Sequence, residues 1–126
     1  LYVEDHARAI DLIVRRAAPG STYNVGGHNE WRNIDIVRQV CGILDELRPS
    51  SRAGGYASQI VFVADRPGHD LRYAIDASAL ERDLGWRPTE TFATGIRKTV
   101  HWYLDHRDWV ADIKAGTYRG ERLGLG

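Results

Sequence analysis

Residues 1–25 read LYVEDHARAIDLIVRRAAPGSTYNV, a stretch in which the spacing of apolar residues changes after a Pro-Gly pair. Before this pair, apolar side chains recur at steps of three and four residues, as on one face of a helix. They are Val3, Ala7, Ile10, Val14 and Ala17. Residues 22–25 (TYNV) are strand-like and end at a Gly-Gly pair. A helix followed by a strand predicts a mixed α and β fold, in the α/β class.

A second helix is predicted from Asn33, a residue type that caps helix starts, to the residue before Pro49. Its apolar residues lie on one stripe, which we expect to be buried. They are Val37, Val40, Cys41, Leu44 and Leu47. Two short strands are predicted further on, at residues 60–63 and around residues 73–75.

Helices are also predicted in the last third of the chain. Asp76 can cap a short helix that ends at Gly85, and Thr91 can cap a longer one. One or two helical turns then precede Gly116. No GxGxxG loop follows a strand, so the sequence does not predict a complete dinucleotide-binding fold.

The composition excludes several classes of function. Lys plus Arg and Asp plus Glu both number 17, so the formal net charge is zero and non-specific nucleic-acid binding is not expected. No apolar run reaches the ~18 residues of a membrane span. Cys41 is the single cysteine, which agrees with a reducing, cytoplasmic compartment. With one cysteine and scattered histidines, no metal site is predicted.

The ends of the sequence bear on its organisation. It begins at Leu1 and contains no methionine, so we expect a fragment of a longer protein. Its 126 residues fit one ordinary domain. A chain of this size can bury roughly two-thirds of its unfolded surface, so independent folding is expected.

The richest local signal for chemistry is residues 65–72, which read DRPGHDLR. Arg66 offers a planar fork of donors that suits phosphate oxygens, and His69 adds a donor near neutral pH. Asp65 or Asp70 could orient one of these side chains, and the Pro-Gly pair predicts a tight turn. The pattern predicts a pyrophosphate-binding loop, and the alternative is a solvated loop of salt-bridged side chains.

Asn33 is a second candidate for ligand binding. As the N-cap of a helix its side chain would bond to the backbone. The two roles are compatible, because a helix start presents N–H groups that attract anions. His28 and Asn29 follow the Gly-Gly pair and could line the same cleft, although a role in the turn is the alternative.

Three stretches together resemble the dTDP-glucose 4,6-dehydratases, a family of extended short-chain dehydrogenases/reductases. They read LYVEDHARAI, TYNVGGHNEWRNIDIV and VADRPGHDLRYAIDASALERDLGWRPTETFATGIRKTVHWYL. The resemblance runs from residue 1 to about residue 118. The first stretch alone would indicate only the wider nucleotide-sugar family, whereas the third is specific for these dehydratases.

The resemblance implies a domain organisation. Residues 1–27 would be the last helix and strand of an NAD-binding Rossmann domain, residues 28–118 a substrate domain and residues 119–126 a tail. The NAD loop, the Tyr-x-x-x-Lys pair and the acid–base carboxylates of the family would precede Leu1. The chain would then be a carboxy-terminal, substrate-binding portion that binds no cofactor and is inactive alone.

The resemblance also implies a reaction and a site. The enzymes oxidise dTDP-glucose at C4 with NAD, eliminate water across C5 and C6, and return the hydride to C6, forming dTDP-4-keto-6-deoxyglucose. Asn33 and the loop Asp65, Arg66, Pro67, Gly68 and His69 match substrate-binding positions. Trp31 departs from the small or basic residue usual in the family.

Other interpretations stay open at this point. The chain could be a stand-alone nucleotide or nucleotide-sugar binding module, or a fragment of a related epimerase or decarboxylase. Family members are commonly homodimers, through helices upstream of this piece. If residues 22–25 lack a neighbouring strand, their exposed backbone edge or the first helix predicts self-association.

Overall fold

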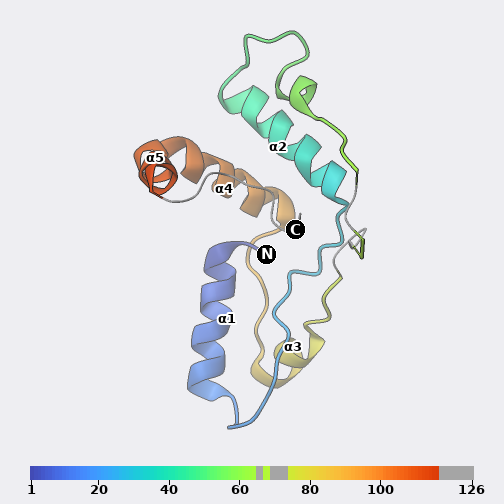
Figure 1. The fold of residues 1–126 in the computed structure, drawn as a ribbon. Helices are drawn as coiled ribbons and strands as arrows, with labels where there is room; N and C mark the ends of the chain where they lie inside the picture. The colour runs from blue at the N-terminus through green and yellow to red at the C-terminus, as the bar shows by residue number, and fades with distance from the viewer. Residues whose placement is uncertain (65–66, 69–73, 117–126) are drawn as a thin grey trace.

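The computed structural model describes residues 1–64, 67–68 and 74–116, and these residues form helices joined by extended segments (Figure 1). The α-helices are α1 (Val3–Arg16), α2 (Asn33–Leu47), α3 (Ser78–Leu84), α4 (Phe92–Asp105) and α5 (Arg107–Ala115). A 3-10 helix, η1 (Tyr56–Gln59), lies between α2 and α3. No helix in these ranges is long and apolar enough to span a bilayer.

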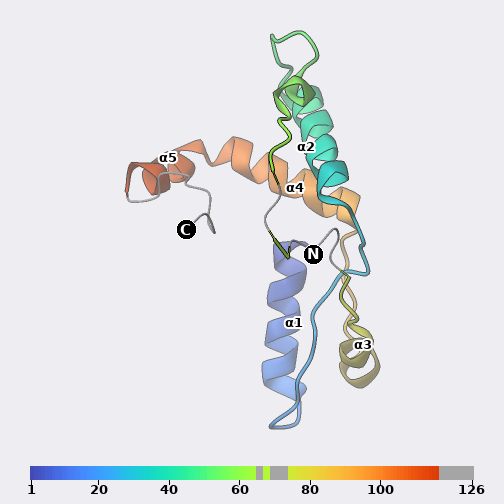
Figure 2. The same ribbon diagram turned by 45° about the vertical axis from the view of Figure 1, so that its right-hand side comes forward.

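The helices form two groups, at opposite ends of the molecule. α1 packs against α3 at one end, while α2 packs against η1 and α4 at the other, and α5 continues from α4. Figures 1 and 2 show extended segments running between the two ends, from α1 to α2 and from α3 to α4. Segments without regular structure connect the two ends, and the start of α1 also lies beside α4, where Lys98 Nζ is 5.5 Å from the centre of the Tyr2 ring.

The main core lies at the α1–α3 end. Ala9 and Leu80 are fully buried there, and the indole of Trp86 is 7% exposed. Half-buried apolar side chains from α1, α3 and the segment after α1 surround them, namely Leu12, Ile13, Tyr23, Val25 and Leu84. α1 and α3 each contribute apolar side chains to this core, which is small for a chain of 126 residues.

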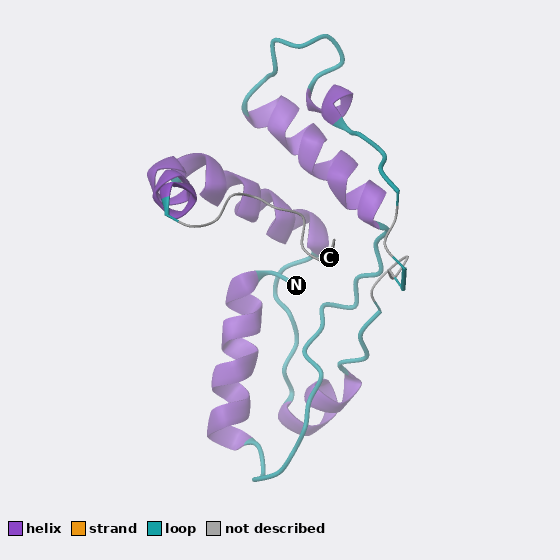
Figure 3. Ribbon diagram, in the orientation of Figure 1, coloured by secondary structure: helices purple, strands orange, loops and turns teal. Residues whose placement is uncertain are grey.

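The predicted strands do not form within the described ranges, which Figure 3 shows as helix and loop only. Residues 22–25, 60–63 and 74–75 have no strand assignment. A strand exists only when its backbone bonds to a neighbouring strand, and local sequence pattern cannot supply that neighbour. The described part of the chain is therefore helical and does not confirm the predicted mixed α and β fold.

The apolar stripe predicted on α1 faces solvent instead of the core. Val3, Ile10 and Val14 are 69%, 50% and 79% exposed. Ala9 and Leu12, on the opposite face, contact the core. α1 carries apolar residues on both faces, and periodicity alone does not say which face meets the rest of the protein.

The stripe predicted on α2 is also incompletely covered. Val37 is 43% exposed, and the buried residue of this helix is Ile43, which the prediction left out. The other predicted members are half-buried, namely Val40, Cys41, Leu44 and Leu47. η1 and α4 both pack against α2, but Val37, Cys41 and Leu44 still line an open groove, so the predicted stripe is not fully covered.

Two helix caps agree with the sequence and two are shifted. The Thr91 side chain accepts a hydrogen bond from Thr94 N at 3.2 Å, and Gly85 ends α3 with a left-handed φ of +70°. By contrast, Arg32 holds the N-cap position of α2, so Asn33 lies inside the first turn. Asp76 lies one residue before the N-cap of α3, yet its carboxylate accepts from Ser78 N at 2.9 Å.

Candidate functional site

The predicted phosphate loop is only partly within the described ranges. Pro67 and Gly68 form an exposed turn, and Gly68 has a φ of +71°, a backbone conformation that favours glycine. The turn predicted at the Pro-Gly pair is confirmed. Asp65, Arg66 and His69 lie outside the described residues, as do Asp70 and Arg72.

Residues 60–62 lead the chain towards the start of α2. Tyr56 N, in η1, donates to Asp45 near the carboxyl end of α2 at 3.0 Å. Phe62 and Ile34 then line one groove of about 470 Å³, and Ile34 follows Asn33 directly. The segment therefore runs along α2 from its carboxyl end to its amino end. Phe62 therefore lies at the end of α2 that Asn33 begins.

Asn33 is exposed in the first turn of α2, beside a charged pair. Arg32 Nε and Nη2 donate to the two carboxylate oxygens of Asp35 at 2.7 and 3.2 Å. Hydrogen bonding from Arg32 holds the pKa of Asp35 below its usual range. The negative charge of Asp35 is thus partly compensated at a helix start that favours anions.

Trp31 connects this helix start to α4. Its ring stacks on Phe92, the first residue of α4, with centroids 4.9 Å apart and planes at 25°. Trp31 remains 39% exposed. Offset aromatic stacking of this kind contributes about 0.5–1.5 kcal/mol beyond buried area. The residue that departs from the family pattern therefore holds the amino ends of α2 and α4 together.

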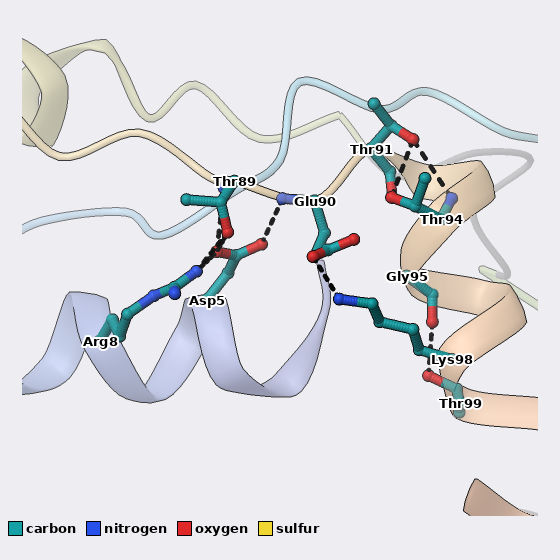
Figure 4. A network of polar contacts seen from close by, with 9 residues as sticks. All are labelled: Asp5, Arg8, Thr89, Glu90, Thr91, Thr94, Gly95, Lys98 and Thr99. Carbon is teal, nitrogen blue, oxygen red and sulfur yellow. Dashed lines mark hydrogen bonds and ion pairs between the residues drawn. The ribbon is translucent and has the colours of Figure 1, made fainter. Parts of the chain in front are cut away.

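Asp5 is the buried polar residue that the sequence interpretation missed (Figure 4). Its carboxylate accepts from Thr89 N and Thr89 Oγ1, both at 2.9 Å, and from Glu90 N at 3.0 Å. Arg8 also donates to it. Asp5 lies in the first turn of α1, where an acidic side chain favours the helix dipole, and its contacts also tie α1 to the segment before α4.

The electrostatic setting of Asp5 follows from these contacts. Burial alone would raise its pKa, but the backbone donors of Thr89 and Glu90, with Arg8, outweigh it and lower the pKa to about 2. Glu90 in turn accepts from Lys98 Nζ at 2.6 Å, which lowers the pKa of Glu90 (Figure 4). Asp5 and Lys98 together fix the segment that enters α4.

The structure also places His28 and Cys41, two further residues considered in the sequence. His28 has a φ of +52° after the Gly-Gly pair, and its Nε2 lies 3.6 Å from Glu81 Oε2. Cys41 is half-buried in the groove beside α2. Within the described ranges, no group of three His, Cys, Asp or Glu side chains could hold a metal ion.

A second pocket was not predicted from the sequence. It has a volume of about 500 Å³ and lies between the start of α1 and helices α4 and α5. Its lining residues are Leu1, Tyr2, Val3, Glu4, Thr99, Trp102, Tyr103 and Trp109. Three of its aromatic residues, Trp102, Tyr103 and Trp109, come from α4 and α5, and sequence spacing cannot place them against α1.

Comparisons with known proteins agree with the family resemblance. A dTDP-glucose 4,6-dehydratase of Escherichia coli is 58% identical over 127 residues, which cover 99% of this chain and 35% of that protein. One from Neisseria meningitidis serogroup B is 55% identical over 128 residues, 100% of this chain and 36% of that protein. The chain thus spans about a third of the length of the curated relatives it matches.

Solved structures of the same kind match the helices described above. A dTDP-glucose 4,6-dehydratase of Bacillus anthracis in complex with NAD has a TM-score of 0.72 and 37% identity, and the match covers 86% of this chain and 32% of that one. One from Streptomyces venezuelae with NAD and TYD bound has a TM-score of 0.65 and 42% identity, covering 84% and 30%. These neighbours have an extended Rossmann-type fold.

The family model described as GDP-mannose 4,6 dehydratase matches residues 1–99, well over half of the sequence. The matched range includes Asn33, the predicted phosphate loop and the Asp5 contacts with Thr89 and Glu90. This chain therefore belongs to the GDP-mannose 4,6-dehydratase family.

Proposed function

We propose that this chain is the substrate-binding portion of a dTDP-glucose 4,6-dehydratase. The observation that carries the proposal is the 58% identity to the Escherichia coli enzyme over 99% of this chain. Curated relatives at 55–59% identity have the same activity in their names, which favours this dehydratase over a related epimerase or decarboxylase. The whole enzyme would convert dTDP-glucose to dTDP-4-keto-6-deoxyglucose.

We assign the cofactor to the part of the enzyme that this chain does not include. NAD in the longer protein would accept the hydride from C4 of the sugar and return it to C6. The described residues contain no glycine-rich loop between a strand and a helix, which a dinucleotide site requires. The function of this chain is then to hold the nucleotide sugar, and alone it would be inactive.

The residues proposed for this function are those of the phosphate loop and the start of α2. Arg66 and His69 would donate to the pyrophosphate, and Asp65 would orient one of them. Pro67 and Gly68 would shape the turn. Two observations support the arrangement: Gly68 has the backbone conformation of a tight turn, and the chain approaches the loop along α2 towards Asn33.

The domain organisation is part of the same proposal. Residues 1–27 would complete the Rossmann domain of the longer protein, residues 28–118 would form the substrate domain, and residues 119–126 a tail. In that protein residues 22–25 would gain a neighbouring strand, which gives the mixed α and β organisation. A homodimer of the longer enzyme and a cytoplasmic location stay predictions from the sequence.

The proposal predicts selective nucleotide binding. We expect calorimetric titration to show that this chain binds dTDP more tightly than UDP, and that Arg66→Ala weakens dTDP binding at least tenfold, because a charged donor to phosphate is lost. Arg52→Ala, in the exposed loop after α2, is the matched control and should leave binding unchanged.

Two results would count against the proposal. Equal weakening by Arg66→Ala and Arg52→Ala would show that overall charge, and not the loop, attracts the nucleotide. Binding of UDP in preference to dTDP would contradict the assigned substrate. If neither nucleotide binds, steady-state kinetics of the whole enzyme replace the titration, and Arg66→Ala must then raise the KM for dTDP-glucose.

A further inference from the structure

Asp5 lies where two parts of the proposed enzyme meet. In the domain organisation proposed above, α1 belongs to the NAD-binding domain, and residues 89–91, which we call the α4 entry segment, belong to the substrate domain. The fully buried carboxylate of Asp5 accepts from Thr89 N with one oxygen and from Glu90 N with the other. The Asp5 contacts therefore cross the boundary between the two proposed domains.

Two cationic side chains also hold the α4 entry segment, one from α1 and one from α4 (Figure 4). Arg8, on α1, donates to Thr89 Oγ1 as well as to Asp5. Lys98, on α4, donates to Glu90 at 2.6 Å. Hydrogen bonds with a charged partner are stronger than neutral ones, so a shift of this segment would break several strong contacts at once.

The start of α1 also packs closely against α4. A Cβ atom on Gly95 of α4 would lie 3.0 Å from Tyr2 Cβ, so the absence of a side chain at Gly95 lets the two helices approach each other here. The Tyr2 ring centre also lies 5.5 Å from Lys98 Nζ. The start of α1 and the first turns of α4 therefore meet closely beside the Asp5 contacts.

The α4 entry segment leads directly to the start of α2. Its last residue, Thr91, caps α4, and the next residue, Phe92, stacks on Trp31 at 4.9 Å. Trp31 precedes Asn33, the first residue of α2, by two positions. A continuous series of contacts therefore runs from Asp5 on α1 to the helix start where the nucleotide sugar is proposed to bind.

We propose that Asp5 is a positioning residue for the dehydratase reaction, an inference that rests on the proposed function. By fixing the α4 entry segment against α1, Asp5 fixes the start of α2 relative to the domain that would hold NAD. Hydride transfer requires reacting atoms about 3–3.5 Å apart, and a misplacement of about 1 Å can slow a reaction about a hundredfold. Asp5 is enclosed by its donors, so it acts on this distance and not on the substrate.

Asp5→Asn would remove this link with little change in side-chain size. Thr89 N and Glu90 N bond to different carboxylate oxygens, whereas an amide has a single acceptor oxygen. One of the two backbone donors would therefore lose its acceptor and face the amide NH2 group. The α4 entry segment should then move away from α1, and Trp31 and the start of α2 should move with it.

The first measurement uses this chain without cofactor. Spin labels at Val14→Cys in α1 and Arg38→Cys in α2, two exposed positions, report the distance between the helices once Cys41 is replaced by serine. Double electron–electron resonance should give one narrow distance distribution for the otherwise natural sequence and a broader or shifted one with Asp5→Asn. Asp11→Asn, on the exposed side of α1, is the matched control and should keep the narrow distribution.

The second measurement is turnover of dTDP-glucose by the whole enzyme. Asp5→Asn should lower kcat about tenfold to a hundredfold and leave the KM within about twofold, because the substrate contacts themselves are intact. A smaller folded fraction would also lower kcat. Single-turnover reactions with saturating enzyme separate the two causes, since their rate constant is that of the folded enzyme and should fall by the same factor as kcat. Asp11→Asn should leave it unchanged.

Thr89→Val provides a milder variant in case Asp5→Asn does not fold. It removes the hydroxyl group that donates to Asp5 and accepts from Arg8, but it leaves both backbone donors in place. The single-turnover rate constant should fall in the same direction by about twofold to tenfold, as expected for the loss of one or two hydrogen bonds.

Three results would overturn this role of Asp5. They are an unchanged distance distribution, an unchanged single-turnover rate constant, and a rise in KM without a fall in the rate constant. If Asp5→Asn does not fold, the same three results with Thr89→Val decide. Failure of the proposed function gives a different result, because the natural whole enzyme would then not convert dTDP-glucose at all.

Discussion

The two ends of the molecule differ in how far they bury their apolar side chains. At the α1–α3 end, Leu80 and Ala9 are fully buried and Asp5 has donors on both carboxylate oxygens. At the α2 end, Val61 and Phe62 are 77% and 78% exposed beside an open groove. The first end is stabilised by contacts within this chain, whereas the second presents a surface that the chain itself does not cover.

This difference explains where ligand binding is expected. Asn33 belongs to the less covered end, and the buried polar contacts belong to the other. Ligand-binding segments are commonly drawn from the less stable parts of a protein, because they must admit a ligand. Variants at the two ends should therefore differ in their effect on stability.

The largest effect is expected for Leu80→Ala in the core of the α1–α3 end. The side chain is fully buried, so its truncation leaves a cavity and should lower the free energy of unfolding by about 2–5 kcal/mol. Urea denaturation followed by circular dichroism measures the change. Val61→Ala is the matched control at the α2 end, and an equal loss in both variants would contradict the difference between the ends.

Asp5→Asn should have the next largest effect. The neutral amide cannot accept from Thr89, Glu90 and Arg8 as a carboxylate does, so about 1.5–3 kcal/mol of stability should be lost. The same denaturation experiment applies. Asp11→Asn, on the exposed side of α1, is the control and should change stability much less. If Asp5→Asn leaves the free energy of unfolding unchanged, the Asp5 contacts do not hold α1 to the segment before α4.

The pH dependence of stability should identify Asp5 as well. Its pKa of about 2 in the folded protein is lower than the usual value of 3.8, so its contribution is present above about pH 4. As the pH falls through 2, protonation removes it. Thermal melts from pH 5 to pH 2 should therefore lose stability more steeply in the natural chain than in Asp5→Asn. Parallel curves would show that other carboxylates dominate in this range.

A smaller effect is expected for Trp31→Ala at the α2 end. Loss of the stacking on Phe92 should cost about 0.5–1.5 kcal/mol. It should also increase amide hydrogen exchange at the starts of α2 and α4. Trp31→Phe retains an aromatic ring and should keep most of the protection. Equal exchange in the two variants would mean that the stacking does not connect these helix starts.

Helix positions were predictable from the sequence, while their environment was not. Thr91 starts α4 through a hydrogen bond to a residue three positions on, and Gly85 ends α3 through its backbone angle. Both roles depend on near neighbours in sequence and can be recognised locally. Asp5 looked like an ordinary acidic residue at a helix start, because its donors lie 84 and 85 residues away in the sequence. Only the packing of α1 against the segment before α4 makes it a buried acceptor.

In the candidate site, too, local features were predictable from the sequence and the contacts between distant segments were not. The Pro-Gly turn, the phosphate-type side chains and the family resemblance are readable along residues 65–72, since each depends on neighbours in sequence. The course of residues 60–62 along α2 towards Asn33, the Trp31 stacking and the pocket between α1, α4 and α5 depend on segments far apart in the chain. No local pattern carries that information.

By itself, the sequence determined the helices, the turn at Gly68 and the family, because these follow from local backbone preferences and from the order of side chains. Tertiary structure decided which face of α1 is buried, and it left residues 22–25 without a strand. The physical reason is the same for both. Burial and strand pairing are properties of two surfaces in contact, and one segment specifies only its own half of each contact.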